Sequence, residues 1–303
     1  MLYDHAGSFS LNTSFLAPLV AAGGEVAAFL PVMRISRHLN LTLRNHRKIV
    51  VVDGKIGFAG GINIGEEYLS GSKRRKRWRD THARIEGPAV LRLQEVFAED
   101  WYFTTHRDLN DARYIPEPEA KGDELVQVLA SGPDHSGEVI HRILFTAITR
   151  AERSVLVTTP YLIPDQAMEI ALETAALRGV DVRILIPRRS DHRLIDHAAR
   201  SFLPELLGAG VRVFAYGAGM MHAKTAVVDG VWSTVGSANM DVRSFRLNFE
   251  ANLVVYGHNL ATRLTEVIEA DLLNATEIRN PTAKRHYRQR VIEGACRILA
   301  PVL

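Results

Sequence analysis

The sequence predicts an α/β protein made of two pseudo-symmetric α/β/α lobes with mixed sheets, in which the first lobe is truncated. The chain has 303 residues, enough for two domains of ordinary size. Two segments 176 residues apart repeat the same polar and apolar pattern. Around them, apolar strand-like runs alternate with amphipathic helix-like runs, which is typical of helices packed on a sheet.

The repeat is the strongest feature of the sequence. "HRKIVVVDGKIGFAGGIN" begins at position 46 and "HAKTAVVDGVWSTVGSAN" at position 222, and 8 of the 18 aligned positions are identical without a gap. The shared polar residues are His46, Lys48, Asp53 and Asn63 in the first half and His222, Lys224, Asp229 and Asn239 in the second. Duplication for packing alone would retain apolar residues and glycine, so the shared polar set indicates a common chemical task.

The two halves differ in how they begin. In the second half, residues 154–163 and 180–188 read as buried strands, with an amphipathic helix between them that stops at Gly179. The first half has no counterpart of the opening strand and helix and is expected to expose a sheet edge. The predicted organisation is therefore an incomplete first lobe (1–110), a linker (111–124), a second lobe (125–280) and a C-terminal amphipathic helix (281–303).

Each repeat places a histidine and a lysine on one side of an extended segment, because residues two apart in a strand face the same way. A small-residue turn then returns an asparagine to the same region. Two such halves facing each other can hold a phosphate with two ammonium groups and two amides, while two imidazoles exchange a proton and form a bond to phosphorus. One His-x-Lys alone would usually be an ordinary surface pair. Two copies with the same spacing favour chemistry, and no metal or other cofactor is expected.

These residues resemble the signature of the phospholipase D superfamily, H-x-K-x4-D-x6-G-[GS]-x-N. Surrounding blocks such as "WRDTHARIEGPAVLRLQEVFAEDW" and "GSANMDVRSFRLNFEANL" most resemble bacterial cardiolipin synthases. The resemblance implies phosphatidyl transfer from phosphatidylglycerol through a covalent phosphohistidine, with release of glycerol. It also implies His46 as nucleophile and His222 as general acid and base, although the pseudo-symmetry leaves the reverse assignment open.

The other site residues follow from strand alternation and from the same resemblance. Phosphate is expected to contact Lys48, Lys224, Asn63, Asn239 and, on one side only, Ser237. Asp53 and Asp229 are expected to face away from the phosphate and to hold their turns. The resemblance suggests Glu250 as the carboxylate that orients His222, and "WRDTH" offers Asp80 for His46.

The expected partners are phosphatidylglycerol, other anionic phospholipids and a membrane surface, with no stable nucleic-acid partner. The basic run at 73–80 and the helix at 281–303 could contact anionic headgroups, or be a solvated loop and an ordinary packed helix. With no apolar run long enough to cross a bilayer, we expect peripheral attachment to the bacterial inner membrane.

Two other functions remain open from the sequence. A phospholipase D-type hydrolase or a nuclease would use the same two histidines, although a nuclease is expected to carry a stronger positive charge than the net +3 here. An inactive fragment or scaffold would fit the missing start of the first lobe. The intact histidines, lysines and asparagines in both halves argue against lost chemistry.

Overall fold

The computed structural model describes residues 1–31, 43–69, 77–134, 137–279 and 287–299. The first half contains β1 (Leu2–Asp4), α1 (Thr13–Ala21), β2 (Ala27–Phe29), β3 (Ile49–Val52), β4 (Ile56–Gly60), α2 (Glu66–Leu69), β5 (His82–Glu86), α3 (Ala89–Thr105) and the 3₁₀ turn η1 (Ala112–Tyr114). The second half begins with β6 (Leu125–Ser131), α4 (Val139–Arg150), β7 (Ser154–Thr158), β8 (Leu162–Ile163), α5 (Gln166–Leu177), β9 (Asp181–Pro187), α6 (Arg193–Gly208) and β10 (Arg212–Tyr216). It continues with β11 (Thr225–Val228), β12 (Trp232–Gly236), β13 (Met240–Asp241), α7 (Val242–Arg246), β14 (Glu250–Tyr256), α8 (His258–Leu272), β15 (Ala275–Glu277) and α9 (Tyr287–Leu299).

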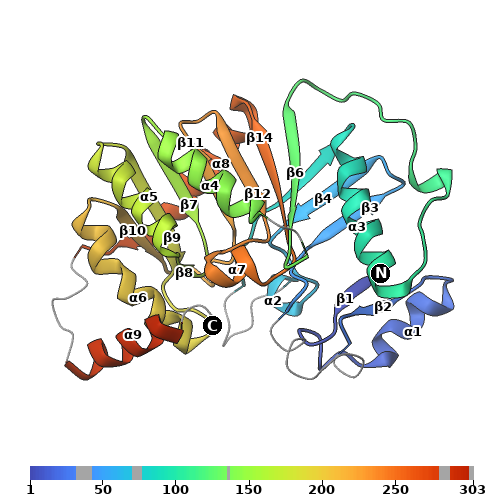
Figure 1. Cartoon of the computed structure of the whole chain (residues 1–303), viewed down its shortest axis with the longest axis horizontal. Helices are drawn as coiled ribbons and strands as arrows, with labels where there is room; N and C mark the ends of the chain where they lie inside the picture. The colour runs from blue at the N-terminus through green and yellow to red at the C-terminus, as the bar shows by residue number, and fades with distance from the viewer. Residues whose placement is uncertain (32–42, 70–76, 135–136, 280–286, 300–303) are drawn as a thin grey trace.

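The second lobe is built on one mixed sheet of eight strands, in the order β15-β10-β9-β7-β11-β12-β14-β6. Strands β7, β9 and β10 run parallel, as their connections through α5 and α6 require. Strands β11, β12, β14 and β6 pair antiparallel. Figure 1 shows this sheet with helices on both sides, which confirms the predicted α/β class.

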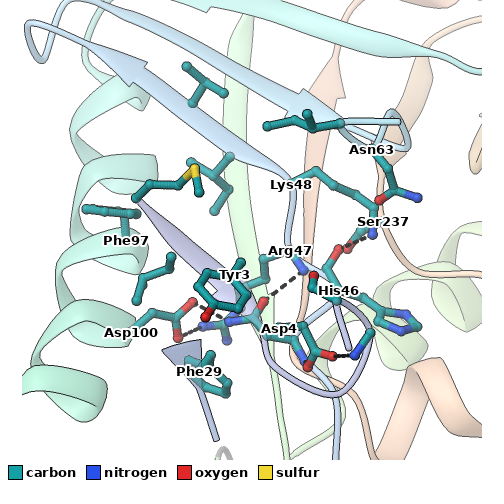
Figure 2. A pocket seen from close by; sticks show the side chains of 18 of the residues that line it. Tyr3, Asp4, Phe29, His46, Arg47, Lys48, Asn63, Phe97, Asp100 and Ser237 are labelled. Carbon is teal, nitrogen blue, oxygen red and sulfur yellow. Dashed lines mark hydrogen bonds and ion pairs between the residues drawn. The ribbon is translucent and has the colours of Figure 1, made fainter. Parts of the chain in front are cut away.

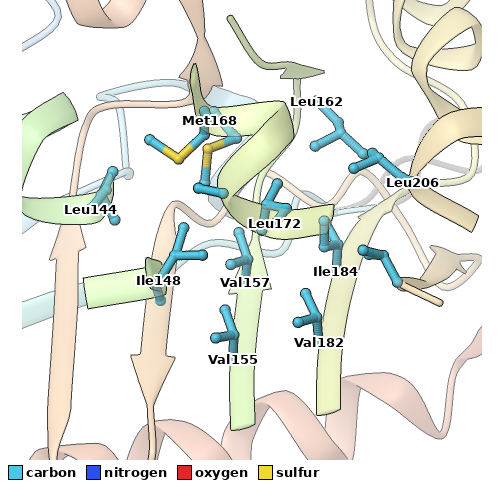
Figure 3. Packing of buried hydrophobic residues seen from close by; sticks show 14 of the residues in the cluster. Leu144, Ile148, Val155, Val157, Leu162, Met168, Leu172, Val182, Ile184 and Leu206 are labelled. Atoms are coloured by element: carbon cyan, nitrogen blue, oxygen red, sulfur yellow. The ribbon is translucent and has the colours of Figure 1, made fainter. Parts of the chain in front are cut away.

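Side-chain alternation along the central strands explains why both faces are covered. Val155 and Val157 on β7 pack with Leu144, Met168 and other residues of α4, α5 and α6, as Figure 3 shows. Leu156, between the two valines, packs with residues of α8 on the opposite face. A strand buried on both faces reads as a continuous apolar run, which is what the sequence has here.

The first lobe has a divided sheet. Strands β1 and β2 form one parallel pair, and β3, β4 and β5 form a separate antiparallel sheet covered by α3. By the internal repeat, β3 corresponds to β11, which pairs with β7 in the second lobe. Within the described residues no strand takes the β7 position in the first lobe. Val50 on β3 is 53% exposed, whereas its counterpart Ala226 is 2% exposed, so the predicted open edge is present.

The paired Asp-Gly turns join equivalent hairpins in the two lobes. Asp53 and Asp229 both have φ of 53°, and the glycine after each also has positive φ. The loops have three residues each, 53–55 and 229–231, and their first two positions take a left-handed backbone that Asp and Gly tolerate. Asp229 also accepts hydrogen bonds from three backbone N–H groups of residues 152–154. Asp53 is exposed, because the first lobe has no described counterpart of that segment.

The lobes are joined through an apolar interface and a buried arginine. Ala59 and Leu93 of the first lobe pack with Leu253 of the second. Arg47 donates to Asp100 on α3 at 2.6 Å and to the carbonyl oxygens of Ser131 at 3.1 Å and Glu250 at 3.2 Å. Because these acceptors lie on α3, β6 and β14, one side chain ties together elements of both lobes.

The C-terminal helix α9 packs on α6, as Figure 1 shows. Cys296 is buried, and Arg297 pairs with Glu169 at 2.9 Å while its guanidinium lies 4.2 Å from the Phe202 ring centroid. Val291 and Ile298, from the predicted apolar stripe, are exposed. The ends of the predicted 281–303 helix, residues 281–286 and 300–303, lie outside the described residues, as do residues 73–76 of the basic run.

Candidate active site

One cleft of about 1820 Å³ brings the repeated polar residues of both lobes together. Its lining includes His46, Lys48, Asn63, His222, Lys224, Ser237 and Asn239. Figure 2 shows His46, Lys48 and Asn63 from the first lobe beside Ser237 from the second. Both His-x-Lys pairs lie immediately before a strand, β3 or β11, rather than within it. Arg47, between His46 and Lys48, pairs with Asp100, which lines another part of the cleft.

His222 lies in a closed, partly aromatic environment. Its Nδ1 lies 2.7 Å from Asp80 Oδ2 and 2.9 Å from the Tyr68 hydroxyl, and the Trp78 ring centroid is 4.9 Å from that of the imidazole. The His222 side chain is 10% exposed. Burial and the Lys224 ammonium lower the pKa of His222 to about 4, despite the Asp80 carboxylate. His222 is therefore neutral near pH 7 when the cleft is empty.

His46 lies in a more open and polar environment. Its Nδ1 is 3.2 Å from Glu250 Oε1 and 3.1 Å from Asn248 Nδ2, and its side chain is 37% exposed. Glu250 is fully buried and accepts from the Ser237 hydroxyl at 2.5 Å. Burial acts to raise the pKa of Glu250, but His46, Lys48 and Ser237 outweigh it, and the pKa lies below its usual value. A carboxylate that stays charged can hold the Nδ1–H of His46 and leave Nε2 facing the cleft.

The predicted pairing of carboxylates with histidines was wrong. Glu250 contacts His46 and Asp80 contacts His222, each across the boundary between the lobes. Two backbone bridges cause this exchange. Asn45 pairs with Phe249, and Met221 pairs with Arg79. The segment that leads into β5 therefore lies beside the His-x-Lys pair of the second lobe and brings Asp80 to His222. The segment that leads into β14 lies beside the His-x-Lys pair of the first lobe and brings Glu250 to His46.

The two lysines reach the cleft from opposite lobes. Lys48 Nζ donates to the His46 carbonyl at 2.6 Å, and Lys224 Nζ lies 3.0 Å from Nε2 of His222. Burial lowers the pKa of both ammonium groups, that of Lys224 to about 7. The nearby carboxylates oppose this shift only in part. A phosphate anion in the cleft would supply the counter-charge that both lysines lack.

The two asparagines occupy equivalent turns but different surroundings. Asn63 is exposed, whereas Asn239 is buried and bonds to the carboxyl of Asp241. Ser237 was expected to contact phosphate, but its hydroxyl proton is donated to Glu250. Ser237 also lines the cleft, so its contact with phosphate stays a prediction.

Sequence reasoning missed three residues that contact the histidines: Tyr68, Trp78 and Asn248. Tyr68 and Trp78 touch His222, and Asn248 touches His46. Pairing in the hairpins gives the signal that could have found two of them. Gly60 lies opposite His82 and Gly236 opposite Asn252, so Trp78 and Asn248 occupy equivalent positions, as do Asp80 and Glu250.

Two related lobes that each contribute a His-x-Lys pair and an asparagine to one cleft can together hold a phosphate group and exchange protons at it. The chain is similar to phospholipase D-like proteins. Residues 144–272 match the family profile described as "Cardiolipin synthase, PLD-like domain". The chain is 43% identical over 305 aligned residues to a cardiolipin synthase of Geobacillus thermodenitrificans, and 42% identical to cardiolipin synthase 2 of Bacillus cereus.

These alignments cover all of this chain but 61% and 59% of the two relatives, so the chain spans about three fifths of their length. Among solved structures, the phosphatidylserine synthase of Haemophilus influenzae superimposes with a TM-score of 0.66 and 14% identity. That match covers 92% of this chain and 74% of the other, and it supports the fold.

Proposed function

We propose that this protein is a phosphatidyltransferase that makes cardiolipin from two phosphatidylglycerol molecules and releases glycerol. The observation that carries the proposal is the shared cleft, in which two histidines with separate carboxylate partners face two lysines. The similarity to cardiolipin synthases along the whole chain supports the choice of lipid substrate.

In the first half-reaction, Nε2 of His46 attacks the phosphorus of one phosphatidylglycerol. The bond from phosphorus to the glycerol oxygen breaks, and His222 donates a proton to that oxygen. Glycerol leaves and the phosphatidyl group stays on His46. Lys48 and Lys224 balance the charge on the phosphoryl oxygens. An anionic phosphate beside His222 offsets the two ammonium charges that lower its pKa, which favours the protonated imidazole needed in this step.

In the second half-reaction, the free hydroxyl of another phosphatidylglycerol replaces glycerol. His222, now neutral, accepts the hydroxyl proton while the oxygen attacks phosphorus. The bond from phosphorus to His46 breaks, and cardiolipin leaves. Water attacking in place of the alcohol would give phosphatidic acid, so exclusion of water decides between transfer and hydrolysis. Trp78, which lines the cleft and packs with its ring tilted against His222, is the residue we assign to that exclusion.

Incubation of the purified protein with radiolabelled phosphatidylglycerol in mixed micelles tests this function. The expected products are cardiolipin and glycerol in equal amounts, because each transfer releases one glycerol. Phosphatidic acid as the main product would identify a hydrolase instead. Cleavage of DNA with no change in the lipid would contradict both lipid functions.

We also propose that the protein works at the surface of an anionic membrane, in a bacterium at the inner membrane. None of the described helices is both long enough and apolar enough to cross a bilayer. The exposed Val291 and Ile298 on α9 offer an apolar stripe, and amphipathic helices of this kind bind at the bilayer interface.

Ile298→Asp is expected to reduce co-sedimentation with vesicles of phosphatidylglycerol and phosphatidylcholine several-fold. The change puts a negative charge where an 81% exposed side chain would enter the lipid. Leu273→Asp is the matched control, since Leu273 is 87% exposed at the end of α8. Equal losses of co-sedimentation in the two variants, or no loss in either, would show that α9 does not contact the membrane.

A further inference from the structure

The two histidines are related by the repeat, yet their surroundings differ at two equivalent positions. Tyr68 follows Asn63 by five residues, and Ser244 follows Asn239 by five. Trp78 and Asn248 are equivalent by hairpin register. His222 therefore contacts an aromatic pair, whereas among the described residues His46 contacts Asn248 and makes no hydrogen bond with Ser244.

Tyr68 and Ser244 occupy equivalent places, each beside the turn that carries the asparagine of its lobe. The backbone N–H of Asn239 donates to the Ser244 hydroxyl at 3.1 Å. The backbone N–H of Asn63 likewise faces the Tyr68 hydroxyl. The tyrosine is longer, so its hydroxyl also reaches across to the other lobe, 2.9 Å from His222 Nδ1 and 3.3 Å from Asp80 Oδ2.

The Tyr68 hydroxyl competes with His222 for one acceptor. It donates to Asp80 Oδ2, the same oxygen that lies 2.7 Å from His222 Nδ1. Tyr68 is 7% exposed, and burial together with Asp80 raises its pKa, so the phenol keeps its proton. An Asp80 oxygen that accepts from a phenol has less negative charge to offer the imidazolium. The other charges that act on His222 are those of Lys224 and Lys48.

We propose that Tyr68 is a positioning residue that makes the two histidines unequal, by linking the Asn63 turn to His222 and weakening the Asp80–His222 pair. The inference rests on the proposed function only for its kinetic consequence. Through Asp80, Tyr68 keeps His222 a readily deprotonated base for the second half-reaction. Ser244 has no such effect on His46, so the repeat yields one acid–base histidine and one nucleophile.

Tyr68→Phe tests the inference, with Ser244→Ala as the matched control. Each variant removes one hydroxyl that faces an asparagine N–H, but only Tyr68 also contacts a histidine. The phenylalanine ring keeps the packing on Trp78, whose centroid is 5.6 Å away. In Tyr68→Phe the titration midpoint of His222, followed by NMR without substrate, is expected to rise by roughly 0.5–1 pH units, the size of one hydrogen bond.

In Ser244→Ala, the His222 midpoint is expected to stay at its wild-type value. In the first half-reaction, where His222 is the proton donor, the basic limb of the kcat/KM profile should shift with the NMR midpoint in Tyr68→Phe alone. An unchanged His222 titration in a folded Tyr68→Phe protein would overturn the proposal, as would the same shift in both variants. Because the titration needs no substrate, it tests the role of Tyr68 even if the protein proves to act on another phosphodiester.

Discussion

Replacing His46 with alanine is expected to reduce cardiolipin formation by at least about 10⁴-fold, because the reaction then has no nucleophile at the open side of the cleft. The same change should leave the thermal unfolding temperature close to that of the wild type, since the side chain is 37% exposed. His222→Asn should also be inactive, but for another reason. In this variant His46 can still attack the phosphorus and take up the phosphatidyl group. The group that activates the acceptor alcohol is missing.

A radioactive label on the lipid phosphorus distinguishes the defect of His46→Ala from that of His222→Asn. His222→Asn is expected to retain radioactive phosphatidyl groups on protein after rapid denaturation, and His46→Ala to retain none. His258→Ala is the control, because His258 is exposed at the start of α8 and its ring lies against the Gly230 carbonyl, outside the cleft. Label on His46→Ala but not on His222→Asn would reverse the roles of the two histidines.

Lys224→Met is expected to lower turnover by about 10²–10³-fold and yet to stabilise the fold by ~1–2 kcal/mol at pH 7. The loss follows from removing one of the two ammonium groups that face the phosphoryl oxygens. The gain follows because the Lys224 side chain is buried, and burial lowers its pKa to about 7. Methionine fills a similar volume without a charge to desolvate.

The lowered pKa of Lys224 also determines how the unfolding free energy changes with pH. In the unfolded chain Lys224 has the ordinary pKa of 10.5, so between about pH 7 and 10.5 the unfolded state binds the extra proton. The contribution of Lys224 to wild-type stability should therefore rise with pH in that window and be absent in Lys224→Met. Lys55→Met, at an exposed lysine outside the cleft, should show neither effect. Equal pH dependence of the unfolding free energy in all three proteins would contradict a depressed Lys224 pKa.

The sequence was sufficient to predict the repeat, the α/β class and the residues that gather in the cleft. His46 and His222 could be found because duplication preserved spacing, and spacing along a strand fixes which side chains share a face. The open edge at β3 was also predictable, since the first half has no run equivalent to β7. These are local properties that can be read from consecutive residues.

The contacts between lobes could not be read in the same way. Asp80 is close to His46 in sequence, and Glu250 is close to His222, so proximity along the chain suggested the wrong partners. The bridge between Arg79 and Met221 exchanges them, and only tertiary structure contains that information. The hydrogen bond from Ser237 to Glu250 is a contact of the same kind, because pairing of β12 with β14 brings the two residues together.

The exchange of carboxylates between lobes makes the catalytic unit indivisible. Either lobe expressed by itself would keep an imidazole and lose the acid beside it, so gene halves cannot have worked in their present form as independent monomers. A change of even a few tenths of an ångström in how the halves sit would disturb both imidazoles together. Ancestral single-lobe forms would have needed a twin molecule to provide the same reciprocal contacts.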